Sequence, residues 1–488
     1  MSIIDRIFRR KTAPTQVRRF QAARIDRLTA DWLATTASIN EELRGDLDRL
    51  RSRGRELVQN NDYAKKFTSL AKTNIIGANG IRLQVRVEDA PGRPDGLANA
   101  AIESAWAKWS ARCDIAGRQS LRDMCETLIG SMPADGEFLV RFVIGADAQN
   151  DYGFALQIID VDRIDTTFSG RFGQNRVIMG VEVDDYRRCV AMHIFAAHPN
   201  DGANSSRQRV RIPAAELIHA YRMERAEQMR GIPWMAPGML SLHHLGSYKL
   251  AALLAAENGA NHYGFFTTPD GAAPIGAFDQ QSGEQITTSQ PGIYDTLPAG
   301  VQFIPHASKY PDAAFGEFVK ATIRRIASGW GLAYHSLAND LENVSYSSIR
   351  SGSIEERDRW VSDQEWFIES FLEPVFTRWL QVSLLRGAIK MQNGSALPVA
   401  KLEKFSRHEW QARRWEWVDP KNDVEANILK VRAGLMSPQD LAASQGQDFE
   451  SVLEAIAQAQ KLADDYGVAL PAYDALPGAT QAAPAPNL

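Results

Sequence analysis

The stretch FGEFVKATIRRIASGWGLAYHSLANDLENVSYSSIRSGSIEERDR, residues Phe315–Arg359, predicts two helices that flank a polar loop. In its first part, apolar side chains recur at the spacing of a buried helix face: Phe315, Phe318, Val319, Ile323, Ile326 and Trp330. Gly329 and Gly331 are expected to end this helix, and serines at 345–348 to begin the next. The loop between them, His335–Ser345, is rich in Asn, Asp and Ser and carries no catalytic signature. It therefore favours a mechanical or lining role over chemistry.

Length, composition and charge indicate a globular chain with two or three domains or subdomains. Its 488 residues exceed what one hydrophobic core usually organises. The net charge of -4 argues against tight nucleic-acid binding, because tight binders usually carry a basic excess. Any contact with DNA is therefore expected to be weak or confined to a patch. The three cysteines, Cys113, Cys125 and Cys189, form no CxxC pair and are expected to be reduced thiols.

The first residues combine a high basic charge with no targeting signal. MSIIDRIFRR lacks the apolar core of a signal peptide, and the longest apolar run, Leu250–Ala256, is far shorter than the ~20 residues that span a bilayer. We therefore expect no cleaved secretion signal and no membrane contact. Residues 1–40 are expected to form a basic arm, whose key cations are Arg9, Arg10, Lys11, Arg18 and Arg19. The arm can bind nucleic acid or an acidic partner, but a solvated terminus explains the same composition.

Residues 41–232 predict α+β organisation, with helices first and a mostly antiparallel sheet after them. A helical stretch from Glu41 to Ile76 is expected to be interrupted near Gly54, and strict alternation over Ile81–Glu88 predicts a strand. A further helix is expected from Ser120 to just before Pro133. Five β segments follow: Glu137–Ile144, Phe154–Val161, Val177–Val183, Val190–Ala196 and Arg207–Ile212. Trp106 and Trp109, one helical turn apart, fit a core stripe better than a platform for stacking bases.

The second half of the chain is expected to be mainly helical. Met235–Tyr263 predicts a long helix, and the Pro- and Gly-rich residues 264–314 predict hairpins and loops. A helix from about Ser345 to Arg386 is expected to kink at Pro374. Residues 401–466 are expected to be helical, with Ser437-Pro438 as a helix start, and the Ala/Pro-rich residues 467–488 to be disordered.

The sequence carries no familiar signature of catalysis. The chain has no P-loop, no GxGxxG after a strand, no GxSxG elbow and no HExxH. The best carboxylate cluster is DVDRID at residues 160–165, which could hold Mg²⁺, but the central Arg163 favours a surface turn. His243 and His244 are adjacent and cannot share a helix face as a ligand pair does. We therefore predict no catalytic residue, metal or cofactor, although a site built from distant residues stays open.

Seven stretches in a fixed order resemble the lambda-like family of tailed-bacteriophage portal proteins. They are RELVQNNDYAKKFTSLAKTNIIGANGIRLQ (55–84), WAKWSARCDIAGRQSL (106–121), ADGEFLVRF (134–142), LQIIDVDRID (156–165), IPAAELIHAYRMERAEQMRGIPWMAPGMLSLHHL (212–245), IASGWGLAYHSLANDLENVSYSSIRSG (326–352) and WEWVDPKNDVEANILKVRAGLMSPQDLAASQGQDFESV (415–452). Each motif alone is weak. Their common order across most of the chain makes the resemblance specific.

The resemblance implies a ring, commonly of twelve copies, at one vertex of a phage capsid. Through it terminase drives double-stranded DNA inward, and the genome later leaves by the same channel. It implies these parts: an α/β wing (41–232), a stem helix (233–263), a clip (264–314), a second stem helix (315–331), a tunnel loop (332–345), a wing or crown-side helix (346–400) and a helical crown (401–466). It also implies these partners: further copies of the chain, DNA bound without sequence preference, the terminase large subunit, the major capsid protein or scaffold, and head-tail adaptor proteins. The expected location is the virion, after assembly in the bacterial cytoplasm.

In the tunnel loop, the resemblance implies that four residues lie nearest the DNA: Asn339, Asp340, Glu342 and Asn343. Carboxylates repel phosphates and would let the duplex slide, whereas a strongly basic lining would hold it. Lys320 and Arg324, one turn apart, would form rings of positive charge if they faced the channel, or would pair with acidic groups of a neighbouring subunit. Two alternatives to the channel remain: a head scaffold without a channel, and a metal-dependent enzyme that uses Asp160, Asp162 and Asp165.

Overall fold

The computed structural model describes most of the chain between residues 36 and 467. The described ranges are 36–91, 93–261, 314–342, 346–415, 420–444 and 449–467, with four short strands between 264 and 305 and a few positions before residue 36. The arm residues Arg9, Arg10, Lys11, Arg18 and Arg19, the loop residue Asn343 and residues 468–488 of the tail lie outside these ranges. Within these ranges, no helix combines the length and hydropathy needed to cross a membrane.

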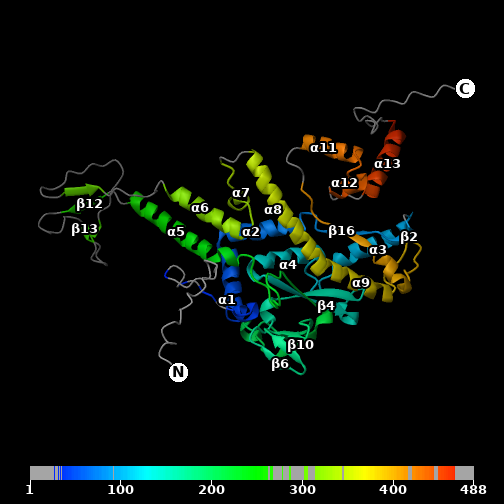
Figure 1. The fold of residues 1–488 in the computed structure, drawn as a ribbon, viewed down its shortest axis with the longest axis horizontal. Coiled ribbons are helices and arrows are strands. Elements are labelled where there is room, and N and C mark those ends of the chain that lie inside the picture. Colours follow the sequence, from blue (N-terminus) through cyan, green and yellow to red (C-terminus); the bar gives the residue numbers. More distant parts are fainter. Residues whose placement is uncertain are drawn as a thin grey trace, which may run out of the picture.

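Helices and sheets pack into one body, from which two helices, α5 and α6, project to one side (Figure 1). The α-helices are α1 Ile39–Asn60, α2 Asp62–Ala71, α3 Gly96–Ser110, α4 Leu121–Asp135, α5 Met239–Asn261, α6 Phe315–Gly329, α7 Tyr334–Ala338, α8 Tyr346–Phe367, α9 Glu373–Leu385, α10 Leu402–Phe405, α11 Pro420–Arg432, α12 Pro438–Ser444 and α13 Phe449–Tyr466. Two π-helical turns, Lys72–Ile76 and Ile368–Leu372, continue α2 and α8. The fold class predicted from the sequence, α+β, is confirmed.

Several helix boundaries follow from local capping. Ser120 and Asp123 form a reciprocal capping box at the start of α4, and Ser437 accepts a hydrogen bond from the Asp440 N–H at 3.0 Å before α12, as predicted. The break between α1 and α2 lies at Asn61, whose side chain caps α2, and not near Gly54. Gly54 is instead a close contact point, because a Cβ there would lie 2.8 Å from the Ala134 carbonyl oxygen of α4.

Two prolines lie within helical segments, and one of them differs from the prediction. Helix α4 does not end before Pro133 but runs through it to Asp135, and Gly136, with φ of 75°, ends it in the left-handed region. At Pro374 the chain stays helical: the π-helical turn Ile368–Leu372 comes just before it, and Pro374 occupies the first turn of α9, where its missing N–H needs no partner.

The strands form two main antiparallel sheets with orders β11-β4-β5 and β10-β9-β8-β7-β6. Their bounds are β4 Glu137–Ile144, β5 Phe154–Ile159, β6 Gly170–Phe172, β7 Asn175–Ile178, β8 Val181–Val183, β9 Cys189–Phe195, β10 Arg209–Pro213 and β11 Leu217–Tyr221. The sequence missed β6 and β11 and merged β7 with β8. Strands β7 and β8 are joined by Met179 and Gly180, with φ of 47° and 83°. Such a turn is usually marked by Asn-Gly or Asp-Gly, and Met-Gly carries no such signal.

Small sheets complete the fold. The predicted strand over 81–88 splits into β1 Arg82–Val85, which pairs with β16 His408–Gln411, and β2 Glu88–Ala90, which pairs with β3 Arg93–Pro94. Because β16 lies within residues 401–466, the expectation that this region is entirely helical is wrong. In the hairpin-rich region, β12 Gly264–Thr267 pairs with β15 Gln302–Pro305, and β13 Ala277–Phe278 with β14 Gln285–Ile286.

The largest core joins the helices to the first sheet. Trp106 and Trp109 are 7% and 2% exposed, and the Trp106 ring packs edge-on against Trp379 at 5.0 Å. The Trp109 indole N–H donates to the Phe154 carbonyl at 2.7 Å. Both tryptophans are therefore core residues, which confirms the prediction against a base-stacking role.

Candidate functional site

Helix α6 precedes the candidate loop and is only partly covered by the rest of the protein. Ile323 and Ile326 are 3% and 1% exposed, whereas Phe318, on the same predicted stripe, is 55% exposed. The outer end of α6 packs on α5 through Tyr248, whose ring lies 5.2 Å from that of Phe318. The apolar stripe of α6 therefore meets the protein core at its C-terminal half and α5 at its N-terminal half.

The turn after α6 is anchored by Trp330. Its ring stacks on Phe67 of α2 at 5.0 Å with an interplanar angle of 12°, and its indole N–H donates to the Met235 carbonyl at 3.1 Å. Gly331 has a φ of 65°, which favours glycine, and Arg359 of α8 donates a hydrogen bond to the Trp330 carbonyl. The point where the chain leaves α6 is thus fixed by α2, α8 and the segment before α5.

The region expected to be a loop contains the short helix α7, and a distant residue caps it. Ala333 precedes α7 and has no capping side chain, but the Glu356 carboxylate of α8 accepts from the Ala333 N–H at 3.3 Å and the Ser336 hydroxyl at 2.7 Å. The Trp360 indole N–H donates to the same carboxylate at 3.1 Å. Sequence reasoning missed Glu356 because no local pattern links it to residue 333.

The predicted loop acids are not free side chains. Asp340 accepts a hydrogen bond from the Tyr334 hydroxyl at 2.8 Å and one from the Glu342 N–H at 3.0 Å. Lys320 Nζ lies 3.8 Å from Asp340 Oδ2 and 3.9 Å from Glu342 Oε2. The Tyr334 hydroxyl and the Glu342 N–H hold the pKa of Asp340 below its usual value, while burial and the bond to Asp340 raise the pKa of Tyr334 to about 12.

The structure brings together most of the predicted loop and helix residues. Arg324 is exposed and lies over the Tyr334 ring, 5.1 Å from its centroid. Asn339 is exposed and ends α7 with a φ of 54°. The charges expected to pair with a neighbouring subunit or to face a channel thus already meet each other within one chain. Tyr334, which joins Asp340 to Arg324, was not singled out from the sequence.

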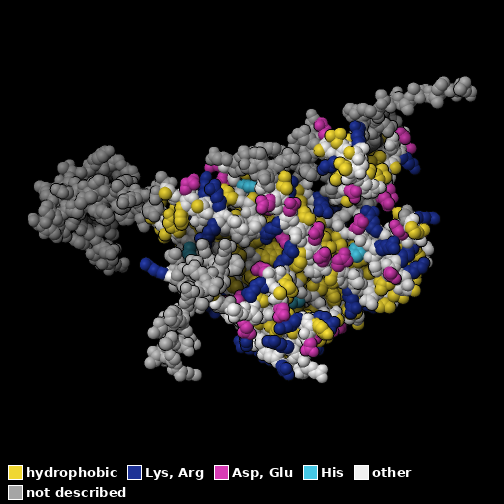
Figure 2. All heavy atoms as spheres, in the orientation of Figure 1, with side chains coloured by type: hydrophobic (Ala, Val, Ile, Leu, Met, Phe, Trp, Pro, Cys, Tyr) yellow, Lys and Arg dark blue, Asp and Glu magenta, His cyan; other side chains and the backbone are white. Residues whose placement is uncertain are grey.

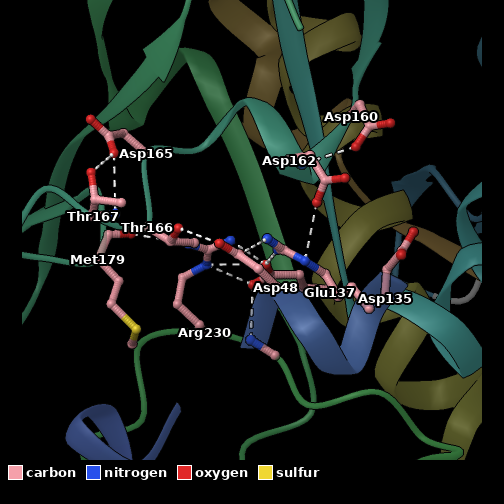
Figure 3. A network of polar contacts seen from close by, with 12 residues as sticks. Asp48, Asp135, Glu137, Asp160, Asp162, Asp165, Thr166, Thr167, Met179 and Arg230 are labelled. Atoms are coloured by element: carbon pink, nitrogen blue, oxygen red, sulfur yellow. Dashed lines mark hydrogen bonds and ion pairs between the residues drawn. The ribbon is translucent and has the colours of Figure 1, made fainter. Parts of the chain in front are cut away.

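A second polar site lies inside the helix and sheet body, around Glu137 of β4 (Figure 3). Its side chain is fully buried and accepts from Arg51 Nη1 of α1 at 2.9 Å, from Arg230 Nε at 3.0 Å and from the Gly231 N–H at 2.8 Å. His219 Nε2 of β11 lies 2.9 Å away. Burial opposes the charged form of Glu137, but Arg230 and His219 outweigh it and hold its pKa well below the usual value.

The acidic run at 160–165 belongs to the edge of this network. Arg55 Nη2 contacts Asp160 at 3.1 Å, and Arg55 Nη1 contacts Asp162 at 2.5 Å. Asp165 lies apart from these two carboxylates (Figure 3) and contacts Arg209 Nε at 2.6 Å. Asp160, Asp162 and His198 have ligand atoms within 4.8 Å of one another. A guanidinium already bridges the two carboxylates, so the arrangement favours a structural ion-pair network over a Mg²⁺ centre.

On the five-stranded sheet, Glu182 of β8 makes a pH-dependent contribution to the stability of the fold. Arg211 Nε and Asn175 Nδ2 donate to it at 2.7 and 2.6 Å, and the bond from Arg211 is the main reason that its pKa falls from 4.5 to about 2. A lowered folded-state pKa means that the stabilisation is present above pH 4.5 and is lost as the pH falls towards 2. Glu182→Gln is expected to lower the free energy of unfolding at pH 7 by about 2 to 3 kcal/mol.

Urea unfolding followed by circular dichroism from pH 7 down to pH 2 checks this prediction. The variant curve should be flatter than the wild-type curve below pH 4.5. Glu409→Gln is the control, because that side chain is 63% exposed and pairs with Arg86 at the surface. A variant that loses stability with falling pH as steeply as the wild type would contradict the assignment.

Comparisons with known proteins agree with the motif order. Residues 25–364 match the family model described as phage portal protein, lambda family. The probable portal protein of Halomonas phage phiHAP-1 is 36% identical over 456 residues, with 91% of this chain and 86% of that protein covered. Portal protein B of Escherichia phage lambda is 19% identical over 460 residues, covering 86% of this chain and 85% of that protein.

A solved structure also aligns with the chain. The neck of a native GTA particle, computed with C12 symmetry, matches with a TM-score of 0.44 and 15% identity, covering 82% of this chain and 93% of that one. The family match over most of the chain and the 36% identity to the Halomonas phage protein carry the conclusion. This chain belongs to the lambda family of phage portal proteins.

Proposed function

We propose that this chain is the subunit of a ring-shaped channel at one vertex of a phage capsid, through which double-stranded DNA enters during packaging and leaves during ejection. Family membership supports this role. The role is structural rather than enzymatic, and it places the protein in the virion. The number of copies, twelve in the family resemblance, is part of the proposal.

The observation that carries the proposal is the exposed apolar surface of the projecting helices α5 and α6. Three leucines on one stripe of α5, Leu250, Leu253 and Leu254, are 58%, 65% and 49% exposed. Figure 2 shows hydrophobic side chains gathered towards the outer ends of α5 and α6. An exposed apolar stripe on a long helix marks an interaction surface, and a second copy of the chain is the partner that a ring supplies.

In this proposal α5 and α6 form the stem, the region with β12 to β15 forms the clip, and α7 with the residues after it forms the tunnel loop. Strand β16 pairs with β1 of the wing, so we place the start of the crown after Gln411 rather than at residue 401. The clip would meet terminase and later the head-tail adaptor proteins, and the wing and crown would meet the capsid protein or scaffold.

Native mass spectrometry and negative-stain electron microscopy of the purified protein test the proposal. The wild-type protein at micromolar concentration is expected to form rings. Leu250→Asp with Leu253→Asp is expected to yield monomers with an unchanged circular dichroism spectrum, because each carboxylate would be buried at the subunit contact.

Leu97→Asp with Leu385→Asp is the control, since these leucines lie on the wing and are 64% and 66% exposed. The control variant is expected to keep forming rings. A wild-type protein that stays monomeric or dimeric would count against the channel.

A further inference from the structure

Two cations of α6 are occupied by side chains of the loop that follows it. Lys320 lies within 4 Å of the carboxylates of Asp340 and Glu342, and Arg324 lies over the ring of Tyr334. The Tyr334 hydroxyl in turn donates to Asp340 at 2.8 Å. The cations, carboxylates and phenol therefore form one connected unit, in which two carboxylates lie beside the positive charge of Lys320.

The two halves of this unit are held with unequal strength. The contacts of Lys320 are 3.8 and 3.9 Å long, and the side chains of Lys320 and Glu342 are 31% and 78% exposed. Solvated ion pairs of this kind contribute little to stability and are screened by salt. Asp340, by contrast, keeps its hydrogen bonds from the Tyr334 hydroxyl and the Glu342 N–H whether or not Lys320 stays beside it.

Lys320 can therefore change partner without unfolding the loop. A DNA phosphate offers the same charge as a carboxylate and, along a duplex, one charge for roughly every 1.7 Å. Helix α6 also carries Arg325, which is exposed and has no ion pair among the described residues. Lys320, Arg324 and Arg325 lie within about two turns of α6. After a phosphate displaces the carboxylates from Lys320, none of these three cations is paired with a described carboxylate of the loop.

We infer that Asp340 and Glu342 act as built-in competitors of DNA phosphate for Lys320, so that the loop keeps the contact with the duplex weak. This inference rests on the proposed channel function and adds a regulatory contact to its tunnel loop. It explains why Lys320 lies beside two carboxylates: Asp340 and Glu342 occupy this cation between passing phosphates.

Fluorescence anisotropy with a labelled 24-base-pair duplex, at 50 to 200 mM salt, tests the inference on the full chain. Asp340→Asn with Glu342→Gln is expected to bind the duplex at least tenfold more tightly at 50 mM salt. The salt dependence should steepen by roughly 0.9 for each additional phosphate contact. Adding Lys320→Gln to this variant is expected to remove most of the gain.

The matched control is Asp147→Asn with Asp151→Asn. It changes the net charge by the same amount at two exposed carboxylates that lie between β4 and β5. Its affinity should change less than twofold. An equal gain in the control would overturn the inference, because net charge alone would then explain the effect, and so would a gain that survives Lys320→Gln.

Native mass spectrometry of the same variants separates this inference from the proposed function. Rings without a gain in affinity would overturn the competition and leave the channel intact. A Lys320-dependent gain in a protein that forms no rings would support the competition and count against the channel.

Discussion

Glu137→Ala is expected to lower the free energy of unfolding by about 3 to 5 kcal/mol, because it removes the carboxylate that compensates the buried guanidinium of Arg230, while Arg51 keeps its contacts with Asp48 and Asp162. Both guanidinium groups contact the Glu137 carboxylate, and the side chains of Arg51 and Arg230 are 2% and 0% exposed. A loss of this size is a large share of the ~5 to 15 kcal/mol that stabilises a typical domain.

Urea unfolding followed by circular dichroism measures the effect. Glu216→Ala is the control, because Glu216 pairs with Arg141 at 3.1 Å but its side chain is 40% exposed. Removing that surface pair should cost less than about 1 kcal/mol. Glu137→Gln keeps the shape but removes the charge and should also destabilise the fold strongly. Equal unfolding midpoints for Glu137→Ala and Glu216→Ala would show that the buried network does not stabilise the fold.

The elements that the sequence predicted well are those whose signals are local. Strand β4 has the bounds predicted from its apolar run, and the capping serines before α4 and α12 mark helix starts as predicted. In each case the residues that form the element also carry its pattern. Capping residues and apolar periodicity act within one or two turns, so they can be read without knowing the fold.

The elements that it missed depend on partners far along the chain. Strand β16 exists because it pairs with β1, and Arg82 lies opposite Gln411 in that ladder. Likewise, α7 depends on the Glu356 carboxylate for its cap. A short segment without its own apolar periodicity is stabilised mainly by such contacts, and these become visible only in the fold.

The candidate site divides in the same way. The sequence singled out Lys320 on the helix and Asp340 and Glu342 in the loop, and assigned them roles towards DNA or, for Lys320, a neighbouring subunit. It could not show that they pair with one another, because that depends on the angle at which the chain leaves α6. Contacts that hold that turn include the stacking of Trp330 on Phe67, which are more than 260 residues apart in the sequence.

Trp330→Ala is therefore expected to have the second large effect on the fold, with a loss of about 3 to 5 kcal/mol in the free energy of unfolding. The substitution removes a side chain that is 2% exposed, its stacking on Phe67 and its hydrogen bond to the Met235 carbonyl. The loop should also become mobile, because Arg359 and Gly331 then hold the turn without an anchor in the core.

Urea unfolding and amide hydrogen exchange of α6 and α7 measure the two consequences separately. Phe318→Ala is the control on the same helix: its side chain is 55% exposed, so its loss should cost far less and leave exchange in α7 unchanged. Trp330→Phe should fall between the two, because it keeps a ring against Phe67 and loses the indole hydrogen bond, which is worth about 1 kcal/mol. If Trp330→Ala unfolds like Phe318→Ala and α7 exchanges no faster, the position of the loop must be set by α8 through Glu356 and Arg359 rather than by the stacked rings.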